Sequence, residues 1–232
     1  MEIHQYISDL VGKIAPTITI DAVADNGDGT FTIYSCNTYY LKEGKTVTID
    51  AVDYRVKSVV KNVQFVVQGS VLPIADSFAL YTPFFFHGTP IAIQKELSQI
   101  KKGKDKTPVF LLHEIVREQN FSRNFESVIE KEVDVQLFIM DTSKFNEWTT
   151  DDHYNVCIVP MRSLLELFID EMVADKKLFD TLELEYEVIP RANFGQFVDQ
   201  KGYDRQLYTD YFSGNQLNIT IKIRKQQCVA GC

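Results

Sequence analysis

The chain has 232 residues, of which 45% are hydrophobic and 12% aromatic, so it can bury a sizeable core and is not disordered as a whole. Its 24 Lys and Arg residues against 32 Asp and Glu residues give a formal net charge of −8. That charge disfavours a protein that wraps nucleic acid, because phosphate binding needs a basic surface, but it is compatible with a protein that lets DNA pass without holding it.

No stretch approaches the roughly 20 apolar residues that cross a bilayer, and the first residues lack the basic start and apolar block of a secretory signal. The four cysteines, at positions 36, 157, 228 and 232, are too scattered for a disulfide scaffold or a zinc pattern. We therefore expect a soluble protein made in a reducing compartment. Cys36 and Cys157 lie among apolar residues and are expected to be packing cysteines.

The first residues predict an amphipathic helix that ends before Pro16, because the residue before proline avoids the helical region. Its apolar residues recur at spacings of three and four, which places them on one stripe. They are Ile3, Ile7, Leu10, Val11 and Ile14. We expect this stripe to pack on its own domain rather than on a neighbour.

Residues 17–68 change to a period of two, which is typical of strands. Residues 17–20 and 31–36 predict a hairpin around the turn at 25–29. A calcium loop is the less favoured reading, because Gly27 and Gly29 occupy positions where a side-chain oxygen is needed. Further short runs, at 46–49, 54–56, 59–60 and 63–67, complete five or so strands, which predicts a small barrel-like subdomain.

The remaining chain predicts a mixed sheet flanked by helices. Helices are expected from Pro90 to residue 100 and from Trp148 towards Ala174, the second capped by a threonine and interrupted or restarted at Pro160. Strands are expected at 108–112, 132–140, 182–189 and 217–223. The fold class is therefore α+β, with an N-terminal helix and small β-rich subdomain in residues 1–80 and a ring-forming α+β domain in residues 81–232.

The sequence offers no constellation for catalysis. His113 begins a near match to a zinc-protease helix that lacks the second histidine, and Asp151, Asp152 and His153 are explained by a helix start. No nucleophile elbow, phosphate-binding loop or dinucleotide motif occurs. We therefore expect no enzyme, and no catalytic, cofactor-binding or metal-binding residues. A metal-dependent hydrolase built on His113, Asp152 and His153 is the weakest alternative.

Two kinds of side chain are candidates for an interface. Aromatic side chains give large contact area at low entropy cost, although core packing is an equal alternative for any one of them. The lysine-rich loop is either a solvated face or a partner for acidic surfaces on an identical neighbour. The candidates are Phe84, Phe85, Phe86, Phe194, Phe197, Tyr203, Tyr208, Tyr211, Phe212, Lys101, Lys102 and Lys104.

Four segments carry a resemblance to a known family: His87-Gly88-Thr89-Pro90 before a helix, residues 108–114, the strand at 133–141, and residues 148–154 before a helix with Pro160. In this order they resemble the tail-terminator and tail-completion proteins of tailed bacteriophages, including ring proteins of phages of gut Bacteroidales.

The resemblance implies an α+β subunit without an active site, which forms a closed ring of roughly six or twelve copies by heterologous contacts. It also implies a place in the virion neck or tail, with the portal and adjoining neck or tail proteins as partners, and synthesis in the bacterial cytoplasm. Phage DNA would pass through without sequence-specific binding, and no membrane is involved. The alternative is a monomeric binding or adaptor module that uses the β-rich N-terminal half.

Overall fold

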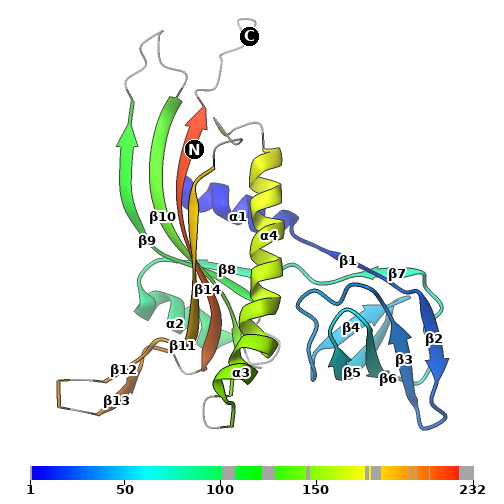
Figure 1. Ribbon diagram of the computed structural model, residues 1–232. Helices are drawn as coiled ribbons and strands as arrows, with labels where there is room; N and C mark the ends of the chain where they lie inside the picture. Colours follow the sequence, from blue (N-terminus) through cyan, green and yellow to red (C-terminus); the bar gives the residue numbers. More distant parts are fainter. Residues whose placement is uncertain are drawn as a thin grey trace, which may run out of the picture.

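The computed structural model describes residues 2–100, 108–121, 129–144, 147–175, 178, 184–198, 200–201, 203–208 and 210–224. Figure 1 shows a large sheet that carries helices and, beside it, a smaller sheet formed by the N-terminal part of the chain. The α+β class expected from the sequence is confirmed, with an N-terminal helix, a small β subdomain and a mixed sheet.

Helix α1 (Ile3–Lys13) lies against helix α4 (Val159–Ala174) and strand β8 (Phe84–His87). Its apolar stripe is buried, as the spacing of three and four predicted. Tyr6 is added to that stripe, and its hydroxyl is buried without a hydrogen-bond partner among the described residues. The helix therefore packs on its own subunit.

The small sheet has five antiparallel strands and does not close into a barrel, because its first and last strands are not paired with each other. In spatial order the strands are β2 (Ala22–Asp25), β3 (Thr30–Tyr34), β6 (Gln64–Gln68), β5 (Val52–Val60) and β4 (Thr46–Ile49). Strand β5 is continuous where two short runs were expected, since a bulge at Lys57 carries the strand past the break in the pattern.

The predicted hairpin is right in its turn and wrong in its first strand. Strand β2 pairs with β3 around a turn in which Asp25 accepts a hydrogen bond of 2.8 Å from the N–H of Gly27. Strand β1 (Thr17–Thr19) instead pairs with β7 (Ser77–Ala79), about sixty residues further on. A period of two shows that a segment is extended, but it does not show which distant strand will be its partner.

The large sheet has five strands, all antiparallel except for the β8–β9 pair. In spatial order they are β11 (Tyr186–Phe194), β14 (Phe212–Arg224), β10 (Ile129–Thr142), β9 (Val109–Asn120) and β8. The three central strands are longer than the sequence predicted, because their polar ends alternate less clearly than their apolar middles.

The helical connections follow their capping signals. Thr89 caps helix α2 (Pro90–Gln99), and Thr149 forms a capping box with Asp152 at the start of helix α3 (Thr150–His153). A π-helical segment (Tyr154–Ile158) joins α3 to α4 directly before Pro160. The missing N–H of Pro160 explains the irregular turn, which confirms an interruption at this residue.

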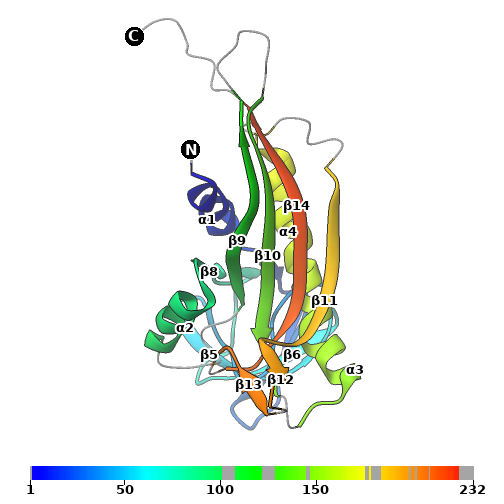
Figure 2. The same ribbon diagram turned by 90° about the vertical axis from the view of Figure 1, so that its left-hand side faces the viewer.

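Alternation along β10 divides the interior into two cores on opposite faces of the large sheet (Figure 2). Val135 and Leu137 face the first core, which also holds α1, α4 and the inner side of the small sheet. Phe138 and Met140 face the second core with α2. Strands β12 (Gln196–Val198) and β13 (Asp204–Gln206) form a small hairpin near the same end of the sheet.

A buried ion pair joins the small sheet to the large one. The ammonium of Lys42, in the loop between β3 and β4, lies 2.7 Å from a carboxylate oxygen of Asp141, near the end of β10. It also donates to the carbonyl and hydroxyl oxygens of Thr142, at 3.1 and 3.0 Å. All three ammonium donors therefore have acceptors, which fixes this junction by charge and geometry together.

Candidate interaction surfaces

Exposed apolar side chains lie on the elements around the second core. Their exposed fractions are 36% for Phe84, 83% for Ile91, 63% for Tyr203 and 40% for Leu207. They belong to β8, α2 and the β12–β13 region, and Tyr208 in that region packs on the same core as α2. Phe84 and Tyr203 are two of the predicted interface residues, so the structure leaves both accessible to a partner.

Three other predicted interface aromatics are core residues. Phe86, Tyr208 and Phe212 are buried in the second core, so for these three residues the structure favours the alternative of core packing over the predicted interface role. The segment that holds the last two has little periodicity because it includes the short β12–β13 hairpin. Sequence pattern alone gave core packing and exposure equal weight at these positions.

Some of the remaining predicted interface residues are partly buried, and the others lie outside the part of the chain that the structure describes. Phe85 packs against the first core while Phe86 enters the second, so the three consecutive phenylalanines do face different sides. Phe194 packs against the second core, and Tyr211 is half-buried. The side chain of Phe197 and residues Lys101, Lys102 and Lys104 lie outside the described residues.

His113 lies in an aromatic cluster rather than in a metal site. Its Nε2 atom is hydrogen-bonded to the hydroxyl of Tyr208, and its ring contacts those of Phe138 and Phe194. Burial lowers the pKa of His113 to about 4, so the ring is neutral at neutral pH and forms this bond without a charge. In the part of the chain that is described, no group of three or more His, Cys, Asp or Glu side chains is arranged to hold a metal ion.

The other residues considered for chemistry have structural partners. Asp152 accepts hydrogen bonds from Thr149, which lower the pKa of its carboxyl group, and the buried ring of His153 lies 3.0 Å from the hydroxyl of Ser213. Cys157 is buried, and burial raises the pKa of its thiol to about 12, so it is the expected packing cysteine. Cys36 is exposed, which corrects the prediction for that residue, because the loop after β3 turns it away from the core.

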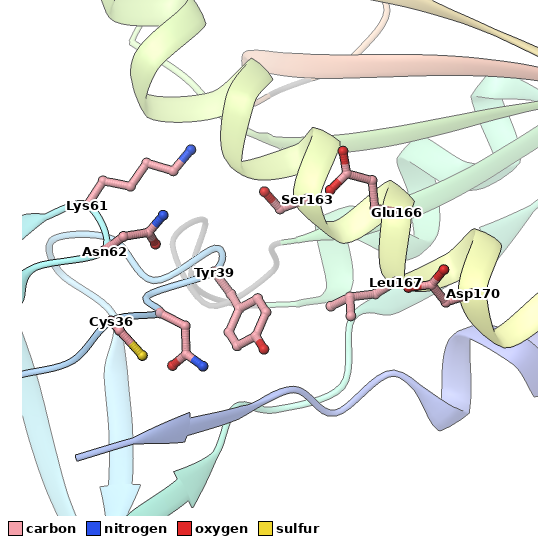
Figure 3. Close-up of a pocket in the computed structure, with 9 residues that line it drawn as sticks. Cys36, Tyr39, Lys61, Asn62, Ser163, Glu166, Leu167 and Asp170 are labelled. Atoms are coloured by element: carbon pink, nitrogen blue, oxygen red, sulfur yellow. The ribbon is translucent and has the colours of Figure 1, made fainter. Parts of the chain in front are cut away.

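A groove separates the small sheet from helix α4 (Figure 3). We call it the α4 groove; its volume is about 240 Å³. One wall comes from the loop after β3 and the β5–β6 turn, and the other from one stripe of α4. The lining residues are Cys36, Asn37, Tyr39, Lys61, Asn62, Ser163, Glu166, Leu167 and Asp170.

Hydrogen bonds hold the small-sheet wall of this groove in place. The side-chain oxygen of Asn62 accepts from the backbone N–H of Thr38 at 3.2 Å, and the hydroxyl of Thr38 accepts from the backbone N–H of Asn62 at 3.1 Å. Asn62 and Tyr39 adopt φ values of 54° and 40°, in the left-handed region. The loop and the turn are thus tied to each other, which makes the wall a preformed surface.

The helical wall of the α4 groove is acidic. Glu166 and Asp170 lie four residues apart on the same side of α4, so their charges repel each other. Among the residues that the structure describes, neither carboxylate has an ion-pair partner within 4 Å, and both side chains are exposed. Lys61 stands on the opposite wall (Figure 3). This wall is suited to a cation supplied from outside the groove.

Comparison of the chain with protein-family models, with curated proteins and with solved structures finds no match. Within the described residues, none of the helices is long and apolar enough to span a membrane.

Proposed function

We propose that the chain is a structural virion protein of a tailed bacteriophage, assembled as a homo-oligomeric ring in the head–tail neck or tail around the DNA channel. The observation that carries this proposal is the group of exposed apolar side chains on β8, α2 and the β12–β13 region, with Ile91 and Tyr203 the most exposed. Exposed apolar surface of this kind is typical of sites that bind another protein.

A closed ring needs two different surfaces on each subunit that are complementary to each other. The exposed apolar residues accompany the second core, whereas the α4 groove lies beside the first. These two surfaces are therefore on opposite faces of the large sheet, as a head-to-tail contact requires. The portal and adjoining neck or tail proteins are the further partners in this proposal.

One face of the large sheet carries charged and polar side chains beyond the second core, and this part of the face suits the DNA channel. Arg117 lies 2.7 Å from carboxylate oxygens of both Glu132 and Asp134, and Thr220 donates to Asp134 at 2.7 Å. Because carboxylates already surround the guanidinium group, this face has little tendency to hold phosphates. DNA would therefore pass it without sequence-specific binding.

Light scattering coupled to size-exclusion chromatography, with electron microscopy of the same fractions, tests the proposal. We expect one discrete oligomer that appears as a ring. Ile91→Glu should weaken assembly by about tenfold or more, because a charge then has to be buried at the contact. The substitution should not harm α2, since an acidic residue in a first helical turn is favourable.

Val71→Glu is the matched control, because Val71 is also exposed but belongs to the small-sheet part of the molecule. It should assemble as the parent chain does. A monodisperse monomer at the highest concentration that stays in solution would overturn the ring. That outcome would favour the second candidate, a monomeric binding or adaptor module that uses the β-rich N-terminal half. The preformed small-sheet wall of the α4 groove supports this second candidate.

A further inference from the structure

The α4 groove and helix α2, which the lysine-rich segment follows in the chain, lie on opposite faces of the large sheet. The segment, residues 101–106, connects the end of α2 to the start of β9 and carries Lys101, Lys102, Lys104 and Lys106. Helix α2 covers one face of the large sheet, whereas the groove lies between the small sheet and α4, on the other face. The segment is joined to the end of α2, on the face opposite the groove, so we take a neighbouring copy rather than the same subunit as its partner.

We propose that the lysine-rich segment of one copy docks in the α4 groove of the next copy in the ring. The inference rests on the proposed function, and it adds a charged contact to the head-to-tail interface, beside the exposed apolar residues that follow the same side of α2. The segment has four lysines and one aspartate, and the helical wall of the groove has two exposed carboxylates four residues apart. A cation between Glu166 and Asp170 relieves their mutual repulsion.

The size of the groove favours side chains over a small-molecule ligand. Its volume of about 240 Å³ is less than the roughly 300–1,000 Å³ of typical small-molecule sites. A space of this size suits single side chains of some length. The lysine-rich segment supplies side chains of this length.

The groove also matches the two parts of a lysine side chain. Tyr39 and Leu167 are half-buried between its walls and present an apolar surface to the alkyl stem. Figure 3 shows Glu166 and Asp170 on α4 on either side of Leu167, and these carboxylates would accept from the ammonium group of a docked lysine. Lys61, on the opposite wall, disfavours a second ammonium there and so limits the number of lysines that enter.

Charge exchange between the two surfaces tests this contact. The double substitution Glu166→Lys with Asp170→Lys reverses the charge of the groove and gives the groove-reversed variant. The triple substitution Lys101→Glu, Lys102→Glu and Lys104→Glu reverses the charge of the segment and gives the segment-reversed variant. Either variant alone should assemble at least about tenfold more weakly than the parent chain, because like charges then face each other. An equal mixture of the two variants should recover the ring, since every contact in an alternating ring pairs opposite charges.

A control variant and a free peptide distinguish the assembly of the ring from the docking of the lysine-rich segment in the groove. Asp9→Lys with Glu185→Lys changes the net charge equally at exposed positions outside the groove and should assemble normally. A peptide of residues 99–108 should bind the segment-reversed variant, whose acidic groove is intact and not filled by a neighbour, and should bind the groove-reversed variant at least about tenfold more weakly, as measured by fluorescence anisotropy.

Rings of the groove-reversed variant that form as readily as those of the parent chain would overturn the docking contact and leave the ring itself standing. A parent chain that stays monomeric while binding the peptide through the groove would overturn the ring and keep the recognition of the lysine-rich segment. Failure of both measurements would overturn both. No recovery in the mixture would also reject the charge pairing between these two surfaces.

Discussion

Replacing Lys42 with methionine is expected to cost about 3–5 kcal/mol of folding free energy, which is a large part of the roughly 5–15 kcal/mol of a typical protein. Asp141 is 1% exposed, and its carboxylate lies 2.7 Å from the ammonium that the substitution removes. The backbone N–H of Thr142 donates to Asp141 at 2.8 Å, but the substitution still removes a charge-assisted contact from a carboxylate that is almost closed to water. Methionine has a similar length, so the loss is one of charge rather than of packing.

Urea unfolding followed by circular dichroism measures this cost. Lys13→Met is the matched control, because Lys13 is exposed and lies 3.9 Å from Asp175, a pair worth less than about 1 kcal/mol. Combining Lys42→Met with Asp141→Leu should recover part of the loss, since it also removes the buried carboxylate that has lost the ammonium of Lys42. A loss below about 1 kcal/mol for Lys42→Met would refute the view that this ion pair holds the two sheets together.

Three further outcomes are expected. Folding lowers the pKa of His113 from 6.5 to about 4, so the contribution of this residue to the free energy of unfolding is fully present above pH 6.5. That free energy should fall by about 1–2 kcal/mol as the pH drops towards 4. His113→Phe should remove this dependence, as unfolding titrations at several pH values would show. In a chain whose two C-terminal cysteines are serine, iodoacetamide should modify exposed Cys36 within the native protein and buried Cys157 only after unfolding, as mass spectrometry would reveal. Thr149→Ala should lower the free energy of unfolding by about 1 kcal/mol, measured with urea, because it removes a helix cap.

Local signals were sufficient where neighbouring residues decide the structure. The stripe that begins at Ile3 needs only a helical period, and the cap at Thr149 needs only an acceptor three residues before a free N–H. Both were predicted from a few adjacent residues. The hairpin turn at Asp25 was predicted for the same reason, since its hydrogen bonds join residues two positions apart.

Long-range packing decided the features that the sequence did not predict. Strand β1 pairs with β7, and both strands are short, so neither carries enough pattern to identify the other. Tyr208 is buried because its ring meets His113, which lies 95 positions earlier in the chain. An aromatic residue in an irregular segment is equally compatible with a core and with an interface until such a partner is known.

The α4 groove was missed for a related reason. Ser163, Glu166 and Asp170 form a stripe on α4, and helical spacing alone places them side by side. The apolar residues of this helix were sufficient to predict it, and its polar stripe carries no motif that indicates a binding surface. The opposite wall comes from Tyr39 and Asn62, over a hundred positions away, and only the tertiary structure brings it to the helix.

The edges of the large sheet bear on how copies can meet. Beyond its pairing with β8, the described part of β9 has one free edge, and its register with β10 shifts at His113 and at Val116. The outer strand β11 contains Pro190, which has no N–H to donate. Bulges and edge prolines oppose the addition of another strand. A ring built from this subunit therefore depends on contacts between side chains, such as a lysine-rich segment in an acidic groove, rather than on a sheet that continues from one copy to the next.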